Sequence, residues 1–368
     1  MVQQETRTQA IINLSALANN ADLVRMHAPH SKILAVIKAD AYGHGLLPIA
    51  EALCHVDGFA VARLEEGVQL RKAGIRKTIL VLTGFTSPMD VDVFSQHELD
   101  AVVHSDYQVD YLNQSQLTKP VTVWLKINTG MNRLGVSVDT VKRIHDSLEL
   151  SAKVRLPIKL MTHLACADDM DSPATSQQLE LFDQAIDGLP GEQSIANSAG
   201  LIGWKQAQRH WVRPGIMLYG GNPFISENVN AGGVLQTVMT LKSTVIALRI
   251  VEKGQSVGYG GTWTAKRTSL IATIGVGYGD GYPRHAAEGT PVLINQQKAG
   301  LIGRVSMDSI NVDVSQLGTV KIADKVILWG DGLAIEEVAQ SSETISYDLM
   351  CGVTQRVPRL YRKGSDGE

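Results

Sequence analysis

Several polar side chains of this sequence lie inside or directly beside apolar segments, where residues of those types can do chemistry. The segment VIKADAYGHG (36–45) places Lys38 at the end of an apolar run. A largely desolvated lysine amine is neutral and nucleophilic. The same lysine can instead extend its ammonium into solvent along its aliphatic stem. The residues around Lys38 leave both interpretations open.

A second lysine interrupts another apolar run. The segment VTVWLKINTGMNRLGV (121–136) contains Lys126 within the run and Arg133 after a Thr-Gly turn. A buried lysine requires a charge partner or a modification that removes its positive charge. The alternative is that the amine of Lys126 reaches solvent.

Three later segments place polar groups where apolar runs end. His163 follows the run in MTHLACADD, Asn197 and Ser198 follow the run in IANSAG, and Arg213 lies in WVRPGIMLYGG. Asn197, Ser198 and the backbone N–H groups after them could hold a phosphate, although helix capping explains the same residues equally well. His163 could also be a hydrogen-bonded structural histidine, and Arg213 a member of a salt bridge at a strand end.

Tyrosines between glycines mark the last third of the chain. Tyr259 lies in SVGYGGTW and Tyr278 in GVGYGDGYPR, while GRVSMDSI contains Met307 and ISYDLM contains Tyr347. Such tyrosines are usually turn residues. A tyrosine has a pKa of about 10, so it acts as a base only with help from positive charge or a hydrogen-bond chain.

The elements that must position these residues follow from the hydrophobic periodicity. Short apolar runs, typical of strands buried on both faces, occupy 31–37, 58–64, 78–84, 98–104, 121–127, 158–164, 192–197 and 211–219. Segments with helical spacing lie between them, at 46–55, 64–73, 138–150 and 176–187 among others. This alternation predicts an α/β fold with an N-terminal (β/α)8 barrel, whose active site would lie at the C-terminal ends of the strands. A doubly wound open sheet is the alternative.

The pattern changes after about residue 228. Strand-like runs separated by glycine-containing turns replace the long helical segments, which predicts a smaller, mainly β domain. We therefore expect a barrel domain over 9–228 and a β domain over 229–368, which residues 1–8 could join. The turn-rich stretch 221–233 is the expected linker.

Composition narrows the class of protein. The 368 residues carry a net charge of −3 with both signs interspersed, which favours a small-molecule ligand over nucleic acid or a membrane surface. No apolar run approaches the roughly 18 residues of a membrane span, and the polar N-terminus does not resemble a signal peptide. The three cysteines are far apart, so neither a disulfide framework nor a cysteine-rich metal site is expected. We expect a cytoplasmic protein without a metal.

From about residue 9 to about residue 360 the chain resembles the bacterial alanine racemases, which are fold-type III pyridoxal-phosphate (PLP) enzymes. Six motifs carry the resemblance, in the family's order: AVIKADAYGHG, KINTGMNRLG, HWVRPGIMLYG, VGYGGTW, GYGDGYPR and GRVSMD. The resemblance implies a PLP-carrying barrel whose active site is completed by the β domain of a second subunit. The expected assembly is a head-to-tail homodimer with alanine as its substrate.

The same resemblance implies a role for each residue. Lys38 carries PLP, and the cofactor-binding set also contains Tyr42, Arg133, His163, Asn197, Ser198, Arg213, Gly215, Ile216 and Tyr347. Within that set, Arg213 faces the pyridine nitrogen with His163 behind it, and Arg133 contacts the phenolic oxygen. Arg133, Met307 and Tyr278 contact substrate or line the entrance, with Tyr259 and Met307 supplied by the other chain. Lys126 is expected to be carbamylated.

These roles suit racemisation, which removes the α-proton from one face of the substrate and returns one to the other. Lys38 would serve D-alanine and Tyr259 would serve L-alanine. The product would supply D-alanine for peptidoglycan or enter alanine catabolism. The alternatives are a racemase of broader specificity acting on serine or basic amino acids, a basic-amino-acid decarboxylase, and a PLP-binding homeostasis protein without enzymatic activity.

Overall fold

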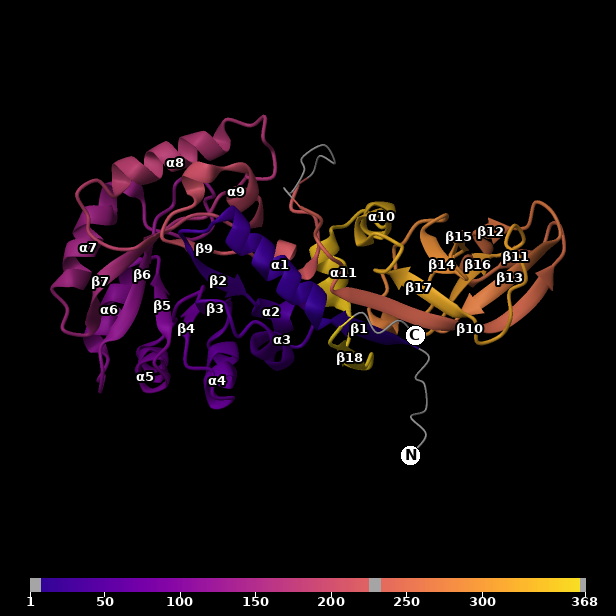
Figure 1. Cartoon of the computed structure of the whole chain (residues 1–368), viewed down its shortest axis with the longest axis horizontal. Helices are drawn as coiled ribbons and strands as arrows, with labels where there is room; N and C mark the ends of the chain where they lie inside the picture. Colours follow the sequence, from indigo (N-terminus) through magenta and orange to yellow (C-terminus); the bar gives the residue numbers. More distant parts are fainter. Residues whose placement is uncertain (1–7, 225–232, 365–368) are drawn as a thin grey trace.

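The computed structural model describes residues 8–224 and 233–364 as a barrel and a mainly β body joined side by side (Figure 1). Within 8–224, eight parallel strands close into a barrel: β2 (Lys32–Val36), β3 (Gly58–Val61), β4 (Thr78–Val81), β5 (Asp100–Val103), β6 (Val121–Lys126), β7 (Val154–Met161), β8 (Gln193–Ser194) and β9 (Trp211–Val212). The α/β barrel prediction is confirmed. The open-sheet alternative is wrong, because β2 pairs with β9 and closes the circle.

The strands read as nearly continuous apolar runs because both of their faces are covered. All four residues of β3 and all four of β5 are buried. Burying one such aliphatic side chain contributes roughly 1.5–3 kcal/mol, so the barrel interior provides a rigid base for its loops. Helices cover the outside of the barrel (Figure 1). They are α1 (Leu14–His27), α3 (Leu46–Ala52), α4 (Leu64–Lys72), α5 (Pro88–His97), α6 (Asp106–Gln114), α7 (Val141–Glu149), α8 (Ala174–Ala185) and α9 (Ser198–Gly203).

The second body is built on a sheet of order β13-β16-β15-β14-β17-β10-β1-β18. Its strands are β1 (Gln9–Asn13), β10 (Met239–Val251), β13 (Ser269–Ile274), β14 (Pro291–Ile294), β15 (Gln297–Ile302), β16 (Ile310–Asp313), β17 (Lys325–Trp329) and β18 (Arg359–Arg362). A small ribbon, β11 (Ser256–Val257) with β12 (Trp263–Thr264), lies at the far end, and α10 (Ile335–Ser341) and α11 (Ser346–Gly352) complete the body.

Strand β1 departs from the predicted division of the chain. Residues 9–13, which we assigned to the barrel domain, pair with β10 and β18 in the sheet of the second body. The alternation of apolar and polar residues can indicate a five-residue strand, but it does not show which strand it pairs with. The sequence therefore could not assign this strand to a sheet. Much of the predicted linker lies outside the described residues, and the domain division itself stays a prediction. No helix in 8–224 or 233–364 is long and apolar enough to cross a membrane.

Candidate active site

A cavity of about 530 Å³ opens where the barrel strands end, at the edge that faces α11. Its volume lies within the range typical of small-molecule and cofactor sites. Eleven of the predicted site residues line it: Lys38, Tyr42, Lys126, Arg133, His163, Asn197, Ser198, Arg213, Gly215, Ile216 and Tyr347. Ten of them come from five separate strand ends of the barrel, and α11 contributes Tyr347. The fold therefore brings together side chains that are more than 300 residues apart.

The cavity is strongly cationic. Lys38, Lys126, Arg133 and Arg213 line it, whereas none of its described lining residues is acidic. Burial, and then the charge of Arg133, lower the pKa of Lys38. Burial and three neighbouring cations lower the pKa of Lys126 to about 8. Both amines therefore carry a larger neutral fraction than an exposed lysine, and the cavity favours an anionic ligand.

Lys38 is the first residue of a turn whose backbone is left-handed. The segment labelled α2 (Lys38–Tyr42) places Ala39, Asp40, Ala41 and Tyr42 at φ values between 52° and 54°, in the left-handed region. Non-glycine residues adopt that region at a cost, and such strain concentrates at functional sites. The Ala39 amide donates to Glu66 Oε1 at 2.7 Å, and the Leu46 amide donates to Asp40 Oδ1 at 2.7 Å. These bonds hold the turn that orients Lys38 and Tyr42.

Gly43 joins this turn to the C-terminal body. Its φ is +77°, and a Cβ at this position would lie 2.1 Å from the Met350 carbonyl oxygen of α11. Arg359 Nε donates to the Gly43 carbonyl at 2.9 Å, and the rest of its guanidinium binds carbonyls just beyond α11. The close approach carries Tyr347 and Cys351 into the cavity.

Tyr42, Ser198 and Gly215 meet on one wall. The Tyr42 ring stacks on Tyr219, with centroids 4.7 Å apart. A Cβ on Gly215 would lie 2.6 Å from the Tyr42 hydroxyl, so only glycine leaves room for the phenol. The Gly215 amide donates to Ser198 Oγ at 2.9 Å. Burial raises the pKa of Tyr42 above its usual range and that of Tyr347 to about 12, so both phenols remain hydrogen-bond donors.

Arg213 is buried, and both of its terminal nitrogens have partners. Its Nη1 donates to Ser194 Oγ at 2.6 Å, and its Nη2 donates to the carbonyls of Thr162 at 2.6 Å and Ile195 at 3.0 Å. The same Nη2 lies 3.2 Å from His163 Nδ1. Burial lowers the pKa of Arg213 to about 10, which leaves it charged at neutral pH. Burial and the charge of Arg213 hold the pKa of His163 well below its usual range, so the imidazole is neutral.

Arg133 lies on a loop whose conformation is held by residues of the loop itself. Asn128 Oδ1 accepts hydrogen bonds from the amides of Gly130 and Asn132, which closes a tight turn after β6. Gly135 has a φ of +132°, and a Cβ there would lie 2.5 Å from the Asn128 nitrogen. The chain therefore doubles back at once, and Arg133 reaches the cavity with an exposed guanidinium.

Three predicted residues lie elsewhere in the same chain. Tyr259, Tyr278 and Met307 belong to the second body and are 68%, 40% and 52% exposed. The Tyr278 amide donates to the Ser306 carbonyl and the Gly279 amide to that of Met307, which places two of these residues side by side. Tyr259 lies between β11 and β12, at the end of the second body far from the barrel, whereas α2 lies near the middle of the molecule (Figure 1). Tyr259 is not part of the cavity that Lys38 lines.

Sequence reasoning missed other cavity residues and the groups that support them. The missed lining residues are Val36, Ala39, Ala62, Leu82, Thr83, Leu134, Met161 and Cys351. Most lie at or just after the end of a barrel strand, a position that the predicted barrel could have indicated. Cys351 lies four residues after Tyr347 on α11, so helical spacing could have identified it. The roles of Glu66 and Tyr219 had no local signal, because they depend on contacts between distant segments.

Both halves of the chain match known families. Residues 12–223 match "Alanine racemase, N-terminal domain" and residues 238–361 match "Alanine racemase, C-terminal domain". An alanine racemase of Vibrio parahaemolyticus is 48% identical, over 96% of this chain and 99% of its own length. One from Vibrio cholerae is 47% identical, over 96% and 97%.

Solved structures agree with this assignment. The biosynthetic alanine racemase from Pseudomonas aeruginosa superposes with a TM-score of 0.93 at 41% identity, covering 97% of this chain and 99% of that one. The alanine racemase from Acinetobacter baumannii gives a TM-score of 0.88 at 34% identity, covering 97% and 99%. With both domains matched and relatives aligned over nearly their full lengths, this chain is an isomerase that belongs to the alanine racemase family.

Proposed function

We propose that this enzyme binds PLP at Lys38 and interconverts L-alanine and D-alanine with Lys38 and Tyr259 as its two acid/base groups. One observation carries the proposal: the cavity gathers four cations and no described carboxylate around a lysine whose pKa burial lowers. Such a cavity suits a ligand that bears a phosphate and a substrate that bears a carboxylate.

The residues present fit the cofactor's phosphate. Tyr42 and Tyr347 supply protonated phenols, and Gly215 lacks the Cβ that would fill the space beside the Tyr42 hydroxyl. Ser198 and the backbone near Ile216 complete this wall, with Asn197 capping α9 through the Gly200 amide at 2.9 Å. When bound, PLP supplies the electron sink for removal of the α-proton.

Lys38 and Tyr259 would act on opposite faces of the substrate. Burial lowers the pKa of Lys38, so its Nζ gives up a proton more readily than an exposed lysine does. Tyr259 lies apart from Lys38 in its own chain and is 68% exposed, so its hydroxyl is available to a second molecule. We therefore propose a head-to-tail homodimer in which Tyr259 and Met307 enter the cavity of the partner subunit, with Tyr278 at the entrance.

Arg213 would face the cofactor's ring nitrogen as a fixed positive donor. An acidic residue there would accept a hydrogen bond from the protonated ring nitrogen and so keep it protonated. A guanidinium has donors only, so it cannot stabilise the protonated form of that nitrogen. We infer that this arrangement disfavours side reactions such as transamination. It also argues against the decarboxylase alternative, which requires an acidic group at this position.

Lys126 is suited to carbamylation. It is 8% exposed, and Arg213, Arg133 and Lys38 all lower its pKa, to about 8 after the larger effect of burial. Its neutral amine would attack CO₂, forming an N–C bond and releasing one proton. The product is an anion between cations, and it would orient Arg133. The expected observation is a ¹³C carbamate resonance in ¹³CO₂-equilibrated buffer that disappears in Lys126→Arg. A spectrum without that resonance would reject the modification.

Subunit exchange tests the shared site. Lys38→Ala and Tyr259→Phe are each expected to abolish nearly all racemisation. A mixed dimer contains one Lys38→Ala chain and one Tyr259→Phe chain. If the sites are shared, one of its sites has both residues intact and the other has both residues replaced. With equal mixing, half the dimers are mixed and one of their two sites is active, so roughly a quarter of the activity should return. If Tyr259 served its own chain, no mixed site would be intact and no activity would return.

The substrate is tested by assaying the PLP-loaded protein with L-alanine, serine, lysine and arginine in parallel. Turnover of alanine well above the rest supports the proposal. The parallel assays are needed because one methylene or hydroxyl group changes the discrimination between two substrates by only about 1–3 kcal/mol. Comparable turnover of serine or lysine would favour the racemase of broader specificity. We place the activity in the cytoplasm, where D-alanine would supply peptidoglycan synthesis or alanine would enter catabolism.

A further inference from the structure

A second polar cavity lies at the other end of the barrel, where the strands begin. It has a volume of about 270 Å³. Thr78, Asp100 and Val121 line it and are the first residues of β4, β5 and β6. The active-site cavity lies at the opposite ends of β4 and β6, so the two cavities are separated by the barrel core.

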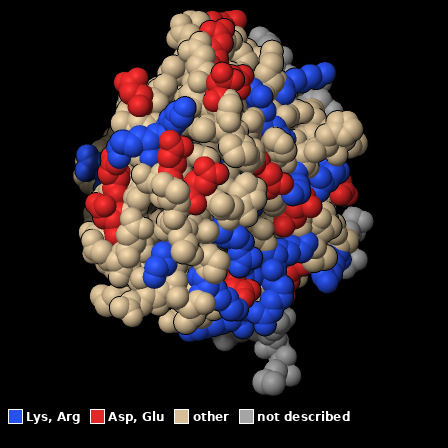
Figure 2. Space-filling model, turned by 90° about the vertical axis from the view of Figure 1, so that its left-hand side faces the viewer, with Lys and Arg blue, Asp and Glu red and all other residues tan. Residues whose placement is uncertain are grey.

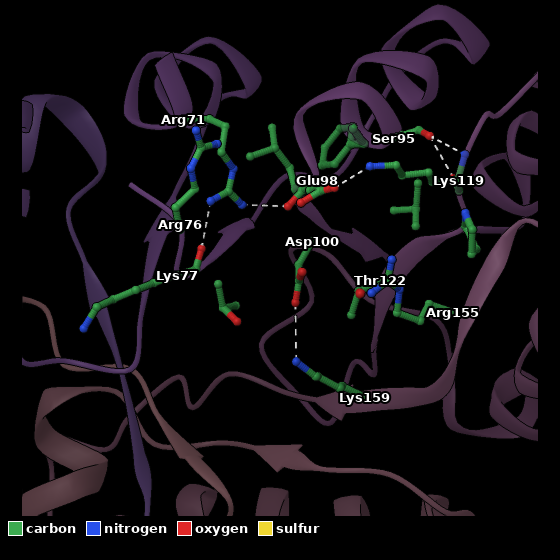
Figure 3. Close-up of a pocket in the computed structure, with 15 residues that line it drawn as sticks. Arg71, Arg76, Lys77, Ser95, Glu98, Asp100, Lys119, Thr122, Arg155 and Lys159 are labelled. Atoms are coloured by element: carbon green, nitrogen blue, oxygen red, sulfur yellow. Dashed lines mark hydrogen bonds and ion pairs between the residues drawn. The ribbon is translucent and has the colours of Figure 1, made fainter. Parts of the chain in front are cut away.

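Cations predominate in this second cavity (Figure 3). Its charged lining residues are Arg71, Arg76, Lys77, Lys119, Arg155 and Lys159, against Glu98 and Asp100. The whole chain carries a net charge of −3, so this excess of positive charge is local. Figure 2 shows the barrel end of the molecule, where Lys and Arg side chains gather on the lower part of the surface.

Both carboxylates already have partners. Lys119 Nζ lies 2.6 Å from Glu98 Oε1, and Lys159 Nζ lies 3.4 Å from Asp100 Oδ2. Asp100 is also buried, which raises the pKa of its carboxyl group above the usual range. These two negative charges are therefore compensated, and four cations remain without a carboxylate within 4.0 Å among the described residues.

Two of those four cations serve the backbone. The Arg71 guanidinium donates to the carbonyls of Ile75, Lys77, His97 and Glu98, which ties two loops together. The Lys77 ammonium donates to the carbonyls of Cys54 and Val56. Both side chains stabilise the strand-start end of the barrel, as expected for residues at this face.

Arg76 and Arg155 make no such hydrogen bonds to the backbone of the described residues. Both are exposed, and neither guanidinium has a hydrogen-bond or ion-pair partner in the described part of the chain. Figure 3 shows Arg71 and Arg76 on one side of Glu98 and Asp100, and Arg155 on the other side. Two unused guanidiniums thus flank a concave surface that already carries excess positive charge.

We propose that this second cavity binds a small phosphorylated ligand, with its phosphate oxygens held by Arg76 and Arg155. A guanidinium binds phosphate through two parallel hydrogen bonds, and these charge-assisted bonds are stronger than those between neutral groups. The cavity far exceeds the roughly 30 Å³ that one water occupies, so a phosphate fits together with a second group. A diphosphate, free or attached to an organic group, matches two flanking guanidiniums better than a single carboxylate does.

The experiment is calorimetric titration of the PLP-loaded protein with sodium diphosphate, at an ionic strength held constant with NaCl. Loading with PLP keeps the titrant out of the active-site cavity. We expect saturable binding that weakens at least about tenfold in Arg76→Gln/Arg155→Gln, because each lost charge-assisted bond is expected to cost that much or more. Absence of saturable binding, or equal binding by the double variant, would overturn the proposal.

A control pair removes two exposed arginines elsewhere. Arg249→Gln/Arg267→Gln makes the same change of charge on the second body and should bind diphosphate like the parent protein. Equal weakening in this pair would show that net charge, rather than the cavity, determines binding, and would reject the site. A nucleoside diphosphate that binds more tightly than diphosphate would identify an organic phosphate as the ligand. Equal affinities would identify the phosphate groups alone.

Discussion

Arg213 Nη2 and His163 Nδ1 lie 3.2 Å apart in the wall of the active-site cavity. An arginine only donates hydrogen bonds, so His163 Nδ1 must accept and the ring proton must lie on Nε2. Burial and the charge of Arg213 keep the pKa of His163 well below its usual range. The pair therefore combines a permanent cation with an imidazole that stays neutral at physiological pH.

Replacing Arg213 by Glu tests why a cation occupies this position. We expect racemisation to fall by about 10²-fold or more, because a preorganised charged donor is lost. We also expect the ratio of transamination to racemisation to rise, since a carboxylate would keep the cofactor nitrogen protonated. The measurement is the conversion of bound cofactor to its amine form, followed by absorbance during turnover. If that ratio stays the same, Arg213 does not suppress the side reaction.

Lys126 gives a prediction for stability against pH. Burial, with the neighbouring cations, lowers its pKa in the folded protein to about 8, from the usual 10.5 expected for the unfolded chain. Below pH 8 both states bind the proton, and the folded state bears the full cost of the buried charge. Between pH 8 and 10.5 the unfolded state binds more protons, so this cost is relieved as pH rises.

Lys126→Met should therefore stabilise the protein most at neutral pH. In CO₂-free buffer we expect a gain on the order of 3 kcal/mol near pH 7, which shrinks towards zero above pH 10.5. Denaturant unfolding of both proteins at several pH values measures the difference. Equilibration with CO₂ should reduce the gain, because a carbamate removes the buried positive charge. A gain that does not depend on pH would show that packing, rather than charge, is responsible.

The barrel could be predicted from the sequence because its strands are buried on both faces. All eight predicted apolar runs contain or overlap a barrel strand, and residues at the ends of seven of them line one cavity. The position of strand β1 in the second sheet was not predicted, since its pairing with β10 is a long-range contact without a local signature. The left-handed turn after Lys38 was also not predictable, because alanine and aspartate normally avoid that conformation and distant residues hold them in it.

Glu66 is one of those distant residues. Its Oε1 accepts from the Ala39 amide, and its Oε2 accepts from the amides of Ala62 at 2.9 Å and Arg63 at 3.0 Å. Glu66→Gln keeps the shape but turns one acceptor oxygen into a donor. We expect a loss of about 1–3 kcal/mol and weaker retention of PLP, measured by denaturant unfolding and by cofactor release on dialysis. Unchanged retention despite lower stability would separate Glu66 from the positioning of Lys38.

Gly43 allows the contact between the left-handed turn and α11 to be tested against a matched control. Gly43 and Gly74 both have positive φ, +77° and +89°, so alanine is strained at either position. A Cβ at Gly43 would lie 2.1 Å from the Met350 carbonyl oxygen, whereas a Cβ at Gly74 meets nothing within 4 Å. Gly74→Ala should therefore cost only the backbone strain, about 1–2 kcal/mol.

Gly43→Ala should cost clearly more, since the backbone of α11 must also move away from the turn. That displacement would carry Tyr347 away from Tyr42, whose ring centroids are now 5.9 Å apart. We therefore expect Gly43→Ala to lose PLP affinity at least about tenfold, while Gly74→Ala retains the affinity of the parent protein, as measured by fluorescence titration with PLP. If both variants lose stability equally and both retain PLP, then the close approach of α11 to Gly43 does not position the cofactor site.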